Sequence, residues 1–105
     1  MTKNQTEKVT DKIQVKDMTT TRREFFRNLK VAMRGIPYLI DGDHITAGKP
    51  DEIVNLDLTP LPPRNIGPTV SFERWQLTIT FTTQSNAQRA QFMRTFDRAF
   101  HRGGG

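Results

Sequence analysis

Apolar and polar positions alternate with two different periods along the chain, and the first clear period is helical. From Phe25 onward, apolar residues recur every three or four positions on one side, while Lys and Arg keep the same spacing on another. Thr21 and Glu24 have the spacing of a capping box, in which a hydroxyl and a carboxylate accept hydrogen bonds from free backbone N–H groups. Gly35 and Pro37 end the pattern. It predicts an amphipathic helix with a basic outer stripe.

Two later segments have the period of two that is typical of strands. In residues 53–59 and again in residues 72–82, large apolar side chains alternate with Thr, Asn, Gln or Asp. One apolar face and one polar face is the pattern of an antiparallel sheet. Before them, residues 37–46 contain Asp41-Gly42, a favoured two-residue turn, and therefore predict a short hairpin.

A second helix is predicted to follow the long strand. Ser85 and Gln88 repeat the capping-box spacing, and the apolar side of the helix then consists of Phe92, Met93, Phe96, Ala99 and Phe100. Together these elements predict an α+β fold, with two amphipathic helices packed on one face of a small antiparallel sheet. We expect one domain over residues 21–102.

Three segments lie outside these patterns. Residues 1–20 are rich in Thr and Lys, and are interpreted either as a flexible polar arm or as a strand added to a partner or to the sheet of the same chain. Residues 61–68 contain three prolines, which lack the N–H that a central strand needs, so they predict an extended loop. Residues 103–105 are all glycine and predict a flexible tail.

Composition narrows the possible chemistry. The chain has no cysteine, which excludes disulfides and thiolate metal sites, and it has neither a secretion signal nor an apolar run long enough for a membrane span. No nucleophile, nucleotide or metalloprotease motif is present, so we expect no enzymatic activity and no cofactor. Asp41, Asp43 and His44 are suitable metal ligands by type, but a solvated hairpin turn explains them equally well, and no metal site is predicted.

The net charge of +5 is distributed unevenly. Residues 21–35 carry five basic residues against one acidic residue, and residues 85–102 carry four against one, whereas residues 36–63 carry five acidic residues against one basic residue. The predicted basic helix faces consist of Arg22, Arg23, Arg27, Lys30, Arg34, Arg94, Arg98 and Arg102. The predicted acidic centre consists of Asp41, Asp43, Asp51, Glu52 and Asp57.

Two functions follow from this charge pattern. Unlike patches on one subunit can meet on neighbouring copies in a head-to-tail contact, which closes into a ring or continues as a filament. Alternatively, the basic stripe can follow a nucleic-acid backbone, with an affinity that falls steeply with salt. Charged side chains of a solvated helix face would give the same stripe without any partner, so this interpretation stays open.

The order of elements adds a resemblance. A helix, a hairpin and strand, a loop, and then an alternating strand that runs into an amphipathic helix resembles the tail-terminator and tail-completion proteins of tailed phages. The residues that carry most of the resemblance are Trp75-Gln76-Leu77-Thr78-Ile79-Thr80-Phe81 and the following residues 85–100. It covers about residues 21–100 and is one of element order. It implies a homo-oligomeric ring in a tail or neck, with other virion proteins as partners, located in the virion or the host cytoplasm.

Overall fold

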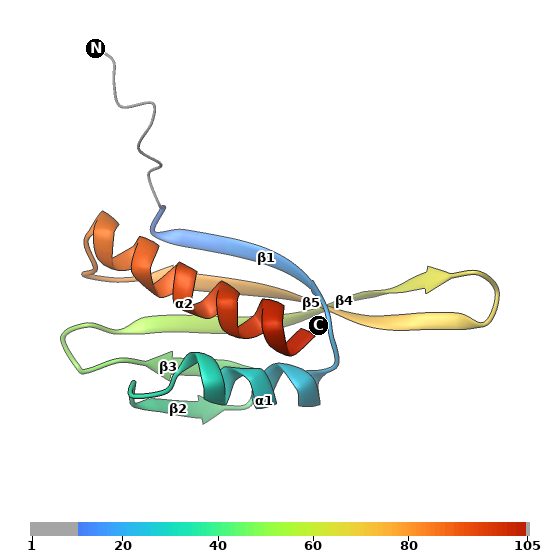
Figure 1. Ribbon diagram of the computed structural model, residues 1–105, viewed down its shortest axis with the longest axis horizontal. Helices are drawn as coiled ribbons and strands as arrows, with labels where there is room; N and C mark the ends of the chain where they lie inside the picture. Colours follow the sequence, from blue (N-terminus) through green and yellow to red (C-terminus); the bar gives the residue numbers. More distant parts are fainter. Residues whose placement is uncertain (1–10, 105) are drawn as a thin grey trace, which may run out of the picture.

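A computed structural model of the protein describes residues 11–104, with side chains described for residues 11–101. Five strands form one antiparallel sheet in the order β1-β5-β4-β3-β2, and both helices lie on the same side of it (Figure 1). The strands are β1 (Ile13–Thr19), β2 (Tyr38–Asp41), β3 (His44–Ala47), β4 (Val54–Ile66) and β5 (Val70–Phe81), and the helices are α1 (Arg22–Ala32) and α2 (Asn86–Gly104). The predicted α+β fold class is confirmed.

Both helices start where their capping boxes predict. The Glu24 backbone N–H donates to the Thr21 hydroxyl at 3.0 Å, and the Glu24 carboxylate accepts from the Thr21 N–H. At α2, the Ser85 N–H donates to the side chain of Gln88 at 2.8 Å, and the Gln88 N–H donates to the Ser85 hydroxyl at 3.2 Å. Reciprocal capping satisfies donors that have no partner inside the helix, which fixes where each helix begins.

The core lies between the sheet and the helices. Leu56, Leu77 and Ile79 are completely buried on the sheet side, because alternate residues of β4 and β5 point towards the helices. The Phe100 ring of α2 lies 4.3 Å from the Phe96 ring and 5.2 Å from the Phe25 ring of α1, measured between centroids. Phe100 therefore joins the two helices to each other and packs against the core.

The sheet begins earlier in the chain than predicted. Residues 13–19, which were included in the expected polar arm of residues 1–20, form β1 and pair with β5 along its whole length. This is the alternative interpretation, a strand added to the sheet of the same chain. Its alternation is weak because Met18 alone packs on the core, whereas Lys16 on the same face pairs with Asp97 of α2 at 2.8 Å. The rest of the predicted arm, residues 1–10, lies outside the described residues.

The predicted loop at residues 61–68 is wrong, because β4 continues to residue 66 and forms a long hairpin with β5. The Leu58 N–H donates to the backbone carbonyl of Asp43, on the side of β4 where β3 lies. Asp43 directly precedes His44, the first residue of β3, so β3 does not extend further along this edge of β4. Pro60 and Pro62, two and four positions after Leu58, lie on this same edge, where no strand needs their missing N–H. The register shifts at Pro62 and Pro63, which together face one residue of β5 as a β-bulge.

Two smaller boundaries also differ from the prediction. Asp41 and His44 pair across the β2–β3 turn, so its two central residues are Gly42 and Asp43, one position later than expected. Gly42 has a φ of +63°, a conformation that glycine adopts without strain. The helix α2 continues to Gly104, so residues 103–104 of the predicted tail are helical backbone. Glycine in a helix costs about 1 kcal/mol relative to alanine, which does not prevent the helix from continuing over these two residues.

Candidate interaction surfaces

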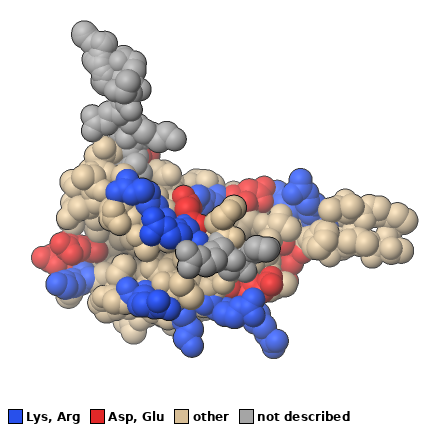
Figure 2. Space-filling view, viewed as in Figure 1, with Lys and Arg blue, Asp and Glu red and all other residues tan. Residues whose placement is uncertain are grey.

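The basic side chains gather on the helix side of the molecule. Figure 2 shows Lys and Arg side chains over both helices, because the polar sides of α1 and α2 point away from the same sheet face. Besides Arg22, whose side chain is exposed and pairs with Asp43, the exposed members are Arg23, Arg27, Lys30, Arg34, Arg94 and Arg98. Within the described part of the chain, Arg27 alone of these forms an ion pair, with Glu24 at 3.7 Å. The side chain of Arg102 lies outside the described residues.

Arg22 and Asp43, which the sequence placed in two separate outward-facing sets, pair with each other while both side chains stay exposed. The Arg22 Nε lies 2.8 Å from the Asp43 Oδ1, and its Nη2 donates to the Gly42 carbonyl at 3.0 Å. The guanidinium also covers the ring of Phe26, with its carbon 4.7 Å from the centroid. Arg22 therefore attaches α1 to the β2–β3 turn within one chain, a contact of two residues that are 21 positions apart in sequence.

The predicted acidic centre is not a single patch. Asp43 precedes β3 and lies near the start of α1, whereas Asp51 and Glu52 follow β3 and lie near the start of α2, bonded through their carbonyls to Thr83 and Gln84. The four residues of β3 separate these groups by roughly 13 Å. The sequence places the acidic residues close together because it cannot show which end of the sheet each turn occupies.

Asp57 lies on the open face of the sheet, the face opposite the helices. The His44 Nδ1 lies 2.6 Å from the Asp57 Oδ1, and the His44 Nε2 lies 3.1 Å from the Thr46 hydroxyl oxygen. These three side chains form a short hydrogen-bonded chain across β3 and β4. Among the residues that the structure describes, no three His, Asp or Glu side chains come together as metal ligands would.

The far ends of β4 and β5 form a projection that the sequence did not predict. Beyond Leu61 and Arg74 the ribbon has two strands only, and residues 62–66 extend it by about 15 Å. Ile66, Val70 and Phe72 are 55%, 45% and 44% exposed, and Arg64 is the single charged residue in positions 60–72. Figure 2 shows the outer part of this projection without charged side chains. Ile66 and Val70, on either side of Gly67-Pro68, could have indicated a hairpin turn. The three prolines of residues 61–68 favoured a loop instead.

The base of this projection is held on both faces. On the open face, the Arg74 Nη2 lies 2.6 Å from the Asp17 Oδ2 and its Nη1 donates to the Pro62 carbonyl, which joins β5 to β1 and to the bulge. The hydrogen bonds from Arg74 hold the pKa of Asp17 below its ordinary value. On the helix face, one oxygen of the Glu73 carboxylate accepts from the Arg22 backbone N–H at 3.1 Å and from the Trp75 indole at 2.7 Å. These contacts join the base of the hairpin to β1 and to the start of α1.

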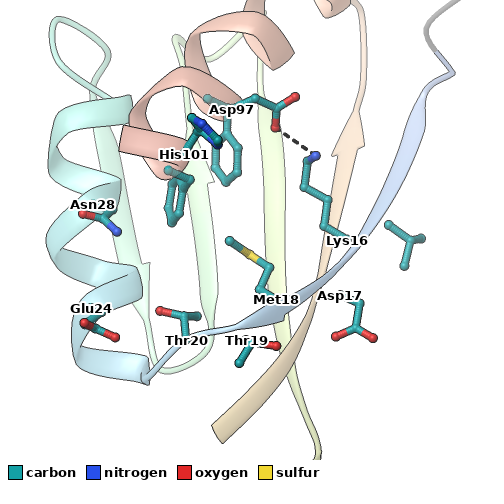
Figure 3. A pocket seen from close by; sticks show the side chains of 12 residues that line it. Lys16, Asp17, Met18, Thr19, Thr20, Glu24, Asn28, Asp97 and His101 are labelled. Atoms are coloured by element: carbon teal, nitrogen blue, oxygen red, sulfur yellow. Dashed lines mark ion pairs between the residues drawn. The ribbon is translucent and has the colours of Figure 1, made fainter. Parts of the chain in front are cut away.

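Among the hollows on the helix side, two are lined by residues of both helices. The larger, of about 630 Å³, lies between β1, the start of α1 and the end of α2, beside the Lys16–Asp97 ion pair (Figure 3). Its wall includes Asn28, which is 7% exposed. The second hollow, of about 390 Å³, lies between the end of α1 and the start of α2 and is lined by uncharged residues, among them Ala32, Ile36 and Phe92.

Comparison with known proteins adds no assignment: no protein-family model, no curated protein and no solved structure matches the chain. Neither helix in the described residues combines the length and the apolar character that crossing a membrane requires.

Proposed function

We propose that the protein is a non-enzymatic structural subunit that associates with copies of itself. The observation that carries this proposal is the projecting hairpin of β4 and β5. A two-stranded ribbon is marginally stable in water by itself, and this one exposes apolar side chains at its end although its base is held firmly in place. Exposed apolar surface on a projection that carries Arg64 as the single charged residue in positions 60–72 is typical of a surface that a protein partner covers.

The resemblance in the order of elements motivates a more specific proposal, a ring or connector subunit in the tail or neck of a phage particle. Of that order, the helix, the hairpin and the long strand that runs into α2 are present, whereas the loop is replaced by the continuation of β4. The supporting evidence is the resemblance of residues 21–100 to tail-terminator and tail-completion proteins, whose subunits form rings. Other virion proteins would be the partners above and below such a ring, and the virion or the host cytoplasm would be its location.

The test of self-association is the molar mass in solution over a wide range of protein concentration. Light scattering or sedimentation velocity should give a discrete oligomer that dissociates on dilution. A variant in which residues 65–71 are replaced by Asn-Gly should shift towards monomer, since Arg64 and Phe72 would then flank a two-residue turn and the exposed tip would be gone. A wild-type protein that stays monomeric at the highest concentration would contradict the proposal.

The contribution of the basic helix face is tested by charge reversal in the same assay. Arg27→Glu and Arg34→Glu together should weaken the oligomer if that face meets a neighbouring copy. The matched control is Arg27→Gln with Arg34→Gln, which removes the charge without reversing it. If neither pair of substitutions weakens the oligomer, the basic face of α1 takes no part in the contact between copies.

A second function, nucleic-acid binding, is favoured by one observation. Arg23, Lys30 and Arg34 of the helix side are exposed and form no ion pair with any described residue, so their charges are available to phosphates. Binding to DNA or RNA at about 50 mM salt, with an affinity that falls steeply as salt is raised, would support this function. Absence of DNA and RNA binding at that salt concentration would contradict this second function.

A further inference from the structure

The apolar end of the hairpin has a complementary surface elsewhere on the same chain. Ile66 pairs with Val70, and Arg64 with Phe72, so these side chains lie on one face of the ribbon, while Asn65 and Ser71 lie on the other. The ribbon thus has an apolar face and a polar face at its tip.

The complementary surface is the interhelical groove, which we define as the hollow between the end of α1 and the start of α2 together with the adjoining hollow beside Gly48. The two hollows have volumes of about 390 and 220 Å³ and share Ile36, Gln88 and Phe92. Their combined size suits a few apolar side chains, since small-ligand pockets measure about 300–1,000 Å³. Glu52 and Lys49 both lie at the edge of the groove beside Gly48. The Glu52 carboxylate is opposite in charge to Arg64, which lies two residues from the hairpin tip, whereas Lys49 has the same sign, so the match between tip and groove is mainly one of apolar surface.

The two surfaces lie at opposite ends of the molecule. The hairpin leaves the body next to the start of α1, where Glu73 accepts from the Arg22 N–H. The groove lies at the end of α1 and beside Gln84, which precedes α2 and bonds to the loop after β3. The end of α1 and the start of α2 lie at the end of the molecule away from the projecting hairpin (Figure 1). Glu73 and Arg74 join the hairpin base to α1 and β1, and the tip points away from the groove of its own chain (Figure 1).

We propose that the hairpin tip of one copy inserts into the interhelical groove of the next copy. This contact joins two different surfaces and is therefore head-to-tail, so its repetition gives a closed ring or a filament. It rests on the proposed function, self-association, and names the two surfaces that make the contact. It places uncharged surface at the centre of the contact, in contrast to the charge pairing that the sequence suggested.

The experiment uses two reciprocal variants of the full chain. The tip variant carries Ile66→Ser and Phe72→Ser, and its matched control carries Asn65→Ser on the opposite face of the ribbon. The groove variant carries Ala87→Glu, which places a charge in the groove from an exposed position on α2, and its control is Ala87→Ser. Because all of these positions are exposed, folding is expected to survive, and circular dichroism checks that it does.

Each variant alone should self-associate about 10- to 100-fold more weakly than the wild type, since one buried apolar side chain or one desolvated charge accounts for such a factor. Both controls should assemble as the wild type does. A mixture of the tip and groove variants should form a 1:1 dimer and nothing larger. The groove variant supplies an intact tip, the tip variant supplies an intact groove, and no second contact can then form.

The outcomes separate this inference from the proposed function. A wild-type protein that is monomeric throughout contradicts both. A wild-type oligomer that neither variant weakens, or two weakened variants whose mixture stays monomeric, overturns the tip-in-groove contact but leaves self-association standing. Dimers formed by either variant alone would indicate a symmetric contact, which also overturns the inference.

Discussion

Glu73 is the side chain whose removal gives the sharpest test of how the hairpin is attached to the body. Its Oε2 accepts from the Arg22 backbone N–H at the start of α1 and from the Trp75 indole N–H, at 3.1 and 2.7 Å. One carboxylate therefore acts as a cap for α1 although it lies 51 residues away in sequence. Glu73→Ala leaves both donors without this acceptor, while the buried core is unchanged.

The expected loss follows from these two contacts. A typical hydrogen bond contributes about 0.5–1.5 kcal/mol net, and a carboxylate at a helix start about 0.3–1 kcal/mol more. Because Glu73 is exposed and water can replace it, we expect the lower part of the sum, about 1–2 kcal/mol. At a urea dependence of about 1–3 kcal/mol per molar, the midpoint of unfolding should fall by roughly 0.3–2 M.

Urea unfolding followed by fluorescence measures this change directly, because Trp75 is the sole tryptophan of the chain and lies at the site. Far-UV circular dichroism gives a second probe that does not depend on the indole environment. Glu73→Gln is the control: it keeps an acceptor oxygen and removes the charge, so its loss should be about 0.3–1 kcal/mol. An unchanged midpoint for Glu73→Ala, or equal losses for both variants, would refute the reasoning.

Three further predictions follow from single contacts. Gly48→Ala should lower the free energy of unfolding by about 1–3 kcal/mol, measured by thermal unfolding, because Gly48 has a φ of +98° and an added Cβ would overlap the Glu52 carbonyl oxygen. Leu77→Ala should lower it by about 2–5 kcal/mol in urea, because Leu77 is completely buried; a loss below 1 kcal/mol would contradict the described core. Arg74→Gln should raise the pKa of Asp17, measured by NMR titration of its carboxyl carbon. Since folding lowers that pKa, the stabilisation exists above the unfolded pKa and is lost as the pH falls through the folded pKa, so the stability difference between wild type and Arg74→Gln should shrink in acid.

Much of the fold could be predicted because its signals are local. Thr21 with Glu24 and Ser85 with Gln88 fix the starts of the helices through contacts three residues apart. The alternation through Leu77 and Ile79 fixes which side of the long strand is buried. These patterns depend on backbone geometry within a few residues, so the sequence alone carries them.

The strand β1 and the far end of β4 could not be predicted in the same way. The pairing of residues 13–19 depends on the free edge of β5, which lies about 60 residues away in the chain. Pro60 and Pro62 are acceptable in a strand solely because β3 ends opposite Asp57 and leaves that edge uncovered. No local pattern reports where a neighbouring strand ends.

The sequence placed the described basic residues correctly and the predicted acidic centre incorrectly, again because local patterns do not report contacts between distant residues. The basic stripes of α1 and α2 are set by helical periodicity, and their exposure on the helix side follows from it. The acidic centre depended on adjacency in sequence, and the turns before and after β3 carry its members to opposite ends of the sheet. Arg22 meets Asp43 through this arrangement, so two predicted outward charges pair with each other instead.

By itself, the sequence of this protein determined the α+β class, the two helix starts, the buried faces and the sign of the charge along each helix. All of these arise from spacings of a few residues. The tertiary structure decided the edge strand, the projecting hairpin, the pairing of Arg22 with Asp43 and the separation of hairpin tip and groove. These features exist because strand pairing brings together residues that are tens of positions apart, and the energy of such contacts depends on which edges and faces remain uncovered.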